Sequence, residues 1–183
     1  IYSGDTGLGF ADDHIRGMTS TGSRDNAIDL GRAATRFKDL YLSGGLKVGG
    51  TGAANTLDDY EQGTWTPAPD GGMSGLTKTD CFYTKIGNTV FIQGRVSGFT
   101  GINSATLLFG GLPFNPEYSS SLGTVGTTFV DLDQGYQLWL HLSHGDDRLA
   151  IRYMKDNAQY ASLAGSDVSS SSNIHFTATY TVA

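Results

Sequence analysis

Apolar and polar residues alternate in short runs through the last two thirds of the chain, a pattern typical of β-strands. The clearest pair of runs, residues 83–86 and 89–96, flanks a Gly87-Asn88 turn and predicts a β-hairpin. Further strands are expected at residues 105–114, 123–132, 135–144, 148–154 and 173–182. At least seven strands are enough for a closed β-sandwich, and we expect one in this part of the chain.

The first 63 residues differ, because their apolar residues form small islands separated by Gly, Asp and Thr. No island is long enough for a sheet that buries both faces. In one of them Leu40, Leu42, Leu46 and Val48 share one parity, which predicts a strand whose apolar side needs a partner. A helix over residues 32–40 is an alternative, since the apolar residues there also fall near helical spacing.

The two regions are expected to meet in the segment NTLDDYEQGTWTP. Thr56, followed three residues later by Asp59, resembles a helix-capping box. A helical turn over residues 57–61 and a plain acidic turn are both open. We therefore divide the chain into a stem with its connector, residues 1–63, and a head, residues 64–183.

The composition supports an all-β fold. Charged residues are 16% and aromatic residues 11% of the 183, which argues against intrinsic disorder. The 26 glycines, about twice the usual share, suit tight turns between short strands. A net charge of −6 disfavours a nucleic-acid partner, and no apolar run approaches the roughly 18 residues of a membrane span, so no membrane insertion is expected. The sequence starts at Ile1 without Met and is expected to be a fragment.

Residues that could support covalent catalysis or metal binding form no recognisable motif. The single cysteine, Cys81, precedes an apolar strand and is expected to be a small buried residue rather than a nucleophile. The four histidines lack the spacing of a metal site, even His141 and His144, which are closest in sequence. We therefore expect no metal and no other cofactor.

Two pairs of carboxylates are candidates for glycoside hydrolysis, which needs one carboxylate on each side of the scissile bond. Asp131 and Asp133 share one side of a predicted strand, and Asp146 with Asp147 occupies a hairpin tip. Both placements are equally expected of residues that protect strand edges or form turns. The chain is therefore expected not to be an enzyme.

A binding surface has more support, around the run YQLWLHL. Its leucines share the parity of a core face, which leaves Trp139 on the opposite face. An aromatic ring beside amide and imidazole groups suits a sugar, whose ring stacks while its hydroxyls bind polar groups. The candidate ligand-binding residues are Gln137, Trp139, His141, Arg152, Tyr153 and Tyr160, with Arg148, Asp156 and Asn157 nearby in the sequence. The alternative is that Trp139 packs under a loop or against a neighbouring subunit.

The segment DLGRAATRFKDLYLSGGLKVGGTGAANTLDDYEQGTWTP, residues 29–67, resembles a recurrent element of bacteriophage tail fibres and tailspikes. In those proteins a DLG…RF/WKDLYLSGG strand leads into a GGTG…LDDYEEGTWTP connector. The runs YTKIGNTVFIQGRV, LPFNP and HFTATYTV are similar to the C-terminal head domains that follow such connectors. The run RAAT departs from the usual serine-rich turn. Receptor contacts in these proteins have no fixed motif, so no binding residue is carried over.

The resemblance implies a homotrimer whose stem interleaves short strands from three chains, with Leu40, Leu42, Leu46 and Val48 facing the partner chains. It implies a β-sandwich head of jelly-roll type. The expected function is that of a tail fibre tip, part of the virion, which binds a host cell-surface polysaccharide or lipopolysaccharide during adsorption. Other virion tail proteins are expected as partners. The alternatives are a tailspike-like glycan depolymerase and a purely structural trimerisation tip.

Overall fold

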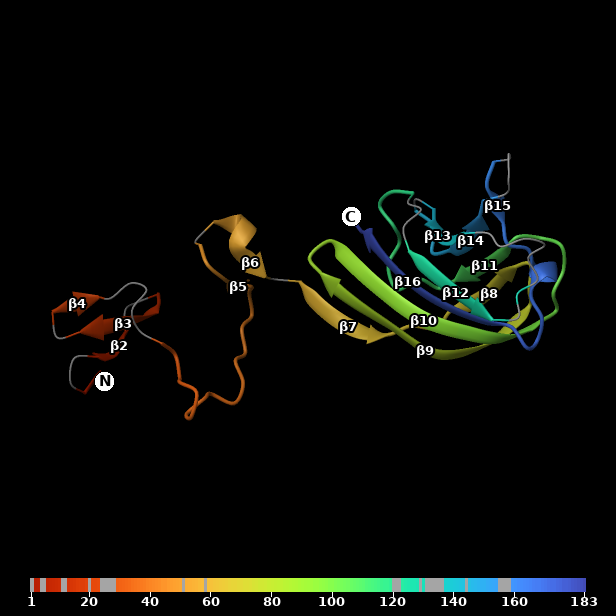
Figure 1. Cartoon of the computed structure of the whole chain (residues 1–183). Helices are drawn as coiled ribbons and strands as arrows, with labels where there is room; N and C mark the ends of the chain where they lie inside the picture. The colour runs from red at the N-terminus through yellow and green to blue at the C-terminus, as the bar shows by residue number, and fades with distance from the viewer. Residues whose placement is uncertain are drawn as a thin grey trace. The chain divides into compact units, whose positions relative to one another are not determined.

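The computed structural model describes residues 2–3, 6–10, 13–19, 21–23, 29–50, 52–57, 59–119, 123–128, 130, 137–143, 145–154 and 159–183. These residues are almost entirely strands, turns and loops, which confirms the all-β class. The chain forms two compact units, Ile1–Ser43 and Gly44–Ala183 (Figure 1). The boundary between these units lies after Ser43, whereas the sequence pattern predicts a boundary after residue 63.

The first unit is a small antiparallel sheet in which each strand pairs with the next along the chain. Its strands are β1 (Tyr2–Ser3), β2 (Thr6–Phe10), β3 (Ile15–Thr19) and β4 (Gly22–Ser23). Backbone hydrogen bonds of 3.2 and 2.9 Å join Arg32 and Thr35 in both directions and close a tight turn. The alternative helix over residues 32–40 is therefore wrong.

The four aligned apolar residues are exposed in the single chain. Leu40 is 64% exposed, Leu42 53%, Leu46 44% and Val48 60%. The strand predicted through them is reduced to the two-residue β5 (Leu46–Lys47), because a strand needs a neighbouring backbone to hydrogen-bond and Leu40 and Leu42 pair with no strand among the described residues. That these residues face partner chains stays a prediction.

The connector folds as a small hairpin instead of a capped helical turn. Strand β5 pairs with β6 (Thr56–Leu57) across a short 3-10 helix, η1 (Ala53–Asn55). The Asn55 side chain donates to the Val48 carbonyl at 3.2 Å and holds the loop closed. The helical turn over residues 57–61 is wrong, since Leu57 ends one strand and the next begins at residue 60.

The predicted strands of the head are all present. The strands are β7 (Tyr60–Thr64), β8 (Ala68–Gly71), β9 (Gly75–Ile86), β10 (Thr89–Thr100), β11 (Leu107–Gly110), β12 (Thr124–Thr128), β13 (Leu138–Leu142), β14 (Leu149–Tyr153), β15 (Ala161–Ser162) and β16 (Asn173–Thr181). A second 3-10 turn, η2 (Gly165–Asp167), precedes β16. The Gly87-Asn88 turn joins β9 to β10 as predicted, with Gly87 at φ +57°. Strand β7 already belongs to the head, because it pairs with β9 along its whole length.

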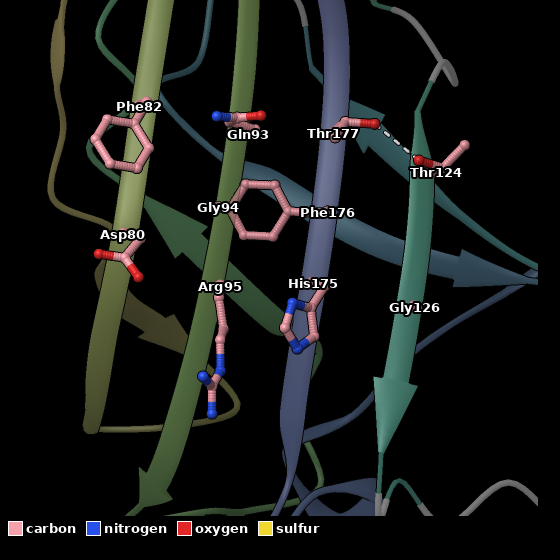
Figure 2. Close-up of a pocket in the computed structure, with 10 residues that line it drawn as sticks. All are labelled: Asp80, Phe82, Gln93, Gly94, Arg95, Thr124, Gly126, His175, Phe176 and Thr177. Carbon is pink, nitrogen blue, oxygen red and sulfur yellow. Dashed lines mark hydrogen bonds between the residues drawn. The ribbon is translucent and has the colours of Figure 1, made fainter.

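The head is one antiparallel sheet that folds over into two layers. The strand order is β7-β9-β10-β16-β12-β13-β14-β11-β8, with β15 on the side of β14. Strands β9, β10, β16 and β12 lie side by side in one layer (Figure 2), and β13, β14, β11 and β8 form the other (Figure 1). The layers of the expected sandwich are thus continuous through the pairing of β12 with β13.

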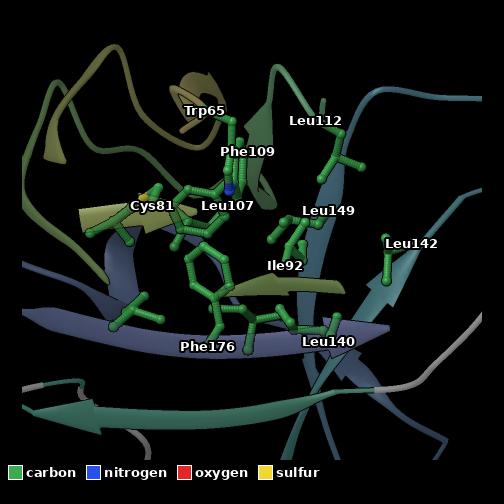
Figure 3. Close-up of a cluster of buried hydrophobic side chains, with 14 of the residues drawn as sticks. Trp65, Cys81, Ile92, Leu107, Phe109, Leu112, Leu140, Leu142, Leu149 and Phe176 are labelled. Carbon is green, nitrogen blue, oxygen red and sulfur yellow. The ribbon is translucent and has the colours of Figure 1, made fainter. Parts of the chain in front are cut away.

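The core lies between the layers, where inward residues of both meet (Figure 3). Strict alternation in β16 buries Ile174, Phe176, Ala178 and Tyr180, as the pattern predicted. The central side chains of the other strands are Val90, Ile92, Val96, Leu107, Phe109, Leu140, Leu142, Leu149 and Ile151. The Tyr180 hydroxyl donates to the Phe114 carbonyl at 3.0 Å, and burial raises the pKa of Tyr180 well above its ordinary value.

Gly94 lets an aromatic ring cover the inner side of β10. It is the register partner of Phe176, whose ring packs edge-on against Trp65 at 5.9 Å between centroids. A Cβ on Gly94 would lie 2.6 Å from the Phe176 ring and 2.8 Å from Cys81 Sγ. Cys81 itself is buried, as expected. The packing of these two side chains therefore requires glycine at this position.

We expect Gly94→Ala to lower the free energy of unfolding by about 1–3 kcal/mol, because the added methyl group overpacks the core. The measurement is the midpoint of denaturant unfolding. Gly126→Ala is the matched control, since a Cβ there meets no atom within 4 Å. Equal stability of the two variants would contradict the packing described for Gly94.

Candidate functional site

A row of side chains crosses the outer face of the head sheet, the face turned away from the core. Its members are consecutive register partners on six neighbouring strands. We call them the outer rank: Phe82, Gln93, Thr177, Thr124, Trp139 and Arg152. Because antiparallel register partners share a face, the rank follows the sheet from β9 to β14, around the fold at β12 and β13.

One end of the outer rank borders a depression of about 490 Å³, which we call the outer hollow. Its lining residues outside the core are Asp80, Phe82, Gln93, Arg95, Thr124, Gly126, His175 and Thr177, which reach it from four strands (Figure 2). Gly126 adds no side chain, which leaves space beside His175, its register partner. The hydroxyls of Thr124 and Thr177 are hydrogen-bonded to each other at 2.7 Å.

A second, smaller hollow adjoins the first across β7 and shares Phe82 and Gln93 with it. On the opposite, core-side face of these strands the Tyr83 hydroxyl donates a hydrogen bond to Glu61, and that bond to a carboxylate raises the pKa of Tyr83. Gln62 and Thr64 of β7 line the second hollow, so the polar surface continues toward the edge strand of the sheet.

The other end of the outer rank is an aromatic and guanidinium cluster. Trp139 of β13 is half-buried and pairs directly with Arg152 of β14. The Arg152 guanidinium carbon lies 4.2 Å from the ring centroid of Tyr160, a cation–π contact. The buried Arg152 Nε has no hydrogen-bond partner among the residues that the structure describes. Three of the six predicted ligand-binding residues thus lie together.

The other predicted residues are placed differently. His141 shares the face of Trp139 and is half-buried, and Gln137 is exposed just before β13. Tyr153 is only 9% exposed and belongs to the core face, as register partner of Leu138, so we leave it out of the site. Arg148 forms an ion pair with Asp70 at 2.9 Å between Nε and Oδ2. Asp156 and Asn157 lie outside the described residues.

The outer hollow contains residues that sequence reasoning did not single out. The alternation in β10 and β16 does predict that Gln93, Arg95, His175 and Thr177 point outward. What the sequence does not reveal is that the last strand inserts beside β10 and brings the two pairs together.

The chemistry of this face is that of hydrogen bonding and stacking. Amide, hydroxyl, imidazole and guanidinium groups alternate with Phe82 and Trp139, which is a combination that suits sugars. No three His, Cys, Asp or Glu side chains are placed to hold a metal ion in the described part of the chain. No helix among the described residues is long and apolar enough to span a membrane.

Of the four carboxylates named for glycoside hydrolysis, Asp146 is exposed at the turn before β14 and Asp147 has hydrogen-bond partners of its own. Asp147 accepts a hydrogen bond from the Gly111 backbone at 3.3 Å and its carbonyl accepts one from Leu112 at 3.0 Å. Both contacts fix the turn before β14. Asp131, Asp133 and His144 fall outside the described residues.

The first unit carries a separate hollow of about 420 Å³ with a mainly apolar lining. Leu8, Ile15, Leu30 and Phe37 line it, and each is at least 43% exposed. Apolar side chains this open to water are typical of a surface that another chain covers.

Comparisons with protein-family models, with curated proteins and with solved structures found no significant match for this chain. The likeness to tail fibres therefore rests on the sequence segments quoted above, and the site on its own residues.

Trp65 is buried in the core and Trp139 is half-buried on the outer face, which gives a direct check of this placement. Trp65→Phe leaves only Trp139, and Trp139→Phe leaves only Trp65, which is 5% exposed. We expect acrylamide to quench the fluorescence of Trp139 several-fold more strongly than that of Trp65. Equal quenching would show that Trp139 is not on an accessible face.

Proposed function

We propose that this chain is the distal part of a phage tail fibre and that the outer face of its head binds a host cell-surface glycan. The observation that carries the binding role is the outer rank. In it Gln93 and two threonines lie between Phe82 and Trp139 as successive register partners, so amide and hydroxyl groups separate the two aromatic rings. Aromatic faces stack on sugar rings, and the polar groups between them bind hydroxyls. An extended glycan fits such a row better than a compact ligand.

The tail-fibre role is supported by the resemblance of residues 29–67 to stem connectors. It is also supported by the apolar residues left exposed in the single chain, which a trimeric stem would cover. Three heads on one stem present three copies of the outer face, so weak binding at each copy gains strength through avidity. The site of action is then the outer surface of the host cell.

Binding is tested with a printed array of bacterial lipopolysaccharide O-antigens and capsular polysaccharides. We expect the wild-type protein to bind a narrow subset and Trp139→Ala to bind that subset roughly tenfold or more weakly, the loss typical of an aromatic anchor. Tyr118→Ala is the control, because Tyr118 is also an exposed aromatic residue of the head but lies outside the outer rank. Binding by Trp139→Ala at the wild-type level would count against this site.

The trimeric stem is tested by measuring the mass of the protein in solution. We expect light scattering of the purified chain to give three times 19.4 kDa, and Leu42→Asp to give a smaller species, because a charge cannot be buried between chains without a partner. Tyr41→Asp is the matched control, since Tyr41 is the neighbour of opposite parity and is 89% exposed. A monomeric wild-type protein would contradict the trimer.

A further inference from the structure

The outer hollow owes its shape to a β-bulge in β9. Gln93 pairs with Phe82, but Arg95 pairs with residue 79, so two residues of β9, Asp80 and Cys81, face the single Gly94 of β10. Asp80 has φ +29°, the only positive φ of a residue other than glycine in the described part of the chain. Such a conformation costs on the order of 1–3 kcal/mol and is often found where function requires it.

The bulge delivers a carboxylate to the edge of the outer hollow. Cys81 points into the core, while Asp80 is exposed beside Gly94 and Arg95 of the next strand (Figure 2). Asp80 is exposed, so burial of its side chain does not compensate for the strained backbone. We infer that the position of this carboxylate is what the bulge provides.

Arg95 is held in place before any ligand arrives. Its Nε and Nη2 both donate to Asn173 Oδ1, at 3.2 and 2.9 Å. Asn173 in turn donates to the Ser171 carbonyl at 3.2 Å, which fixes the amide. A guanidinium restrained in this way loses little conformational entropy on binding.

The rest of the outer hollow offers one apolar platform and free space. Phe82 is 41% exposed and presents its ring next to Gln93. Gly126 leaves the opposite side open. The volume of about 490 Å³ falls within the range of small-molecule sites, roughly 300–1,000 Å³.

We propose that the outer hollow binds one neutral sugar ring through two adjacent hydroxyls. The Asp80 carboxylate accepts hydrogen bonds from both hydroxyls, Arg95 donates to a sugar oxygen, and the ring lies on Phe82. An acidic group in place of these two hydroxyls is disfavoured, because its charge would lie beside the Asp80 carboxylate. The proposal rests on the glycan binding proposed for the head, and it adds the class of sugar that the head selects.

Two substitutions test the hollow without disturbing the fold. Asp80→Asn removes the charge and replaces one acceptor oxygen by an amide donor, and asparagine tolerates positive φ. Gly126→Thr fills the space with a residue suited to strands, at a backbone conformation open to any residue. We expect each to lower binding at least tenfold on the array spots that the wild-type protein binds, with an unchanged unfolding midpoint. Asp146→Asn, at the exposed turn before β14, is the control for charge and should bind normally.

The chemistry is tested on the same array after mild periodate oxidation, which cleaves the bond between adjacent hydroxyl-bearing carbons. We expect binding to be lost on oxidised spots. If Trp139→Ala weakens binding while Asp80→Asn and Gly126→Thr bind like wild type, the hollow is not a sugar site but the proposed function stands. If oxidation leaves binding intact, recognition through adjacent hydroxyls is wrong. If the wild-type protein binds no glycan on the array, both proposals fail.

Discussion

The pairing of the last strand inside the sheet is the interaction on which the rest of the head depends. All nine residues of β16 pair with β10, and five of them pair with β12 on the other side. The inward side chains of β16 supply Phe176 and its neighbours to the core, and the outward ones supply His175 and Thr177 to the outer hollow. Core and site are therefore two faces of one strand, and a change that displaces it removes both.

This arrangement explains why the binding surface proposed here lies on strands and not on loops. Register fixes each member of the outer rank against a neighbour on the next strand, so the spacing of the rings and polar groups is set by the backbone. The β9 bulge is the local exception, and it is also where the strained Asp80 lies. A rigid, preorganised face suits repeated weak contacts with a polysaccharide, because little entropy is lost at each copy.

The sequence predicts the strands of the head and their buried faces well, because alternation depends only on the local pleat. It predicts the outward direction of Trp139 for the same reason, and the burial of Cys81 from its place before an apolar strand. It does not predict which strands pair with each other. The pairing of Arg95 with His175 and the position of β7 in the head sheet therefore come from the structure alone. The capping-box pattern at Thr56 was overridden by pairing of β6 with β5. The bulge at Asp80 is not predicted from the sequence, since aspartate tolerates positive φ but does not require it.

The most direct test of glycan binding by the outer face is a crystal structure of the protein with an oligosaccharide taken from the array spots that it binds. We predict sugar rings along the outer rank, with one ring in the outer hollow against Phe82 and its adjacent hydroxyls within hydrogen-bond distance of Asp80. Sugar bound at the turns of the head, with the outer rank empty, would contradict this assignment.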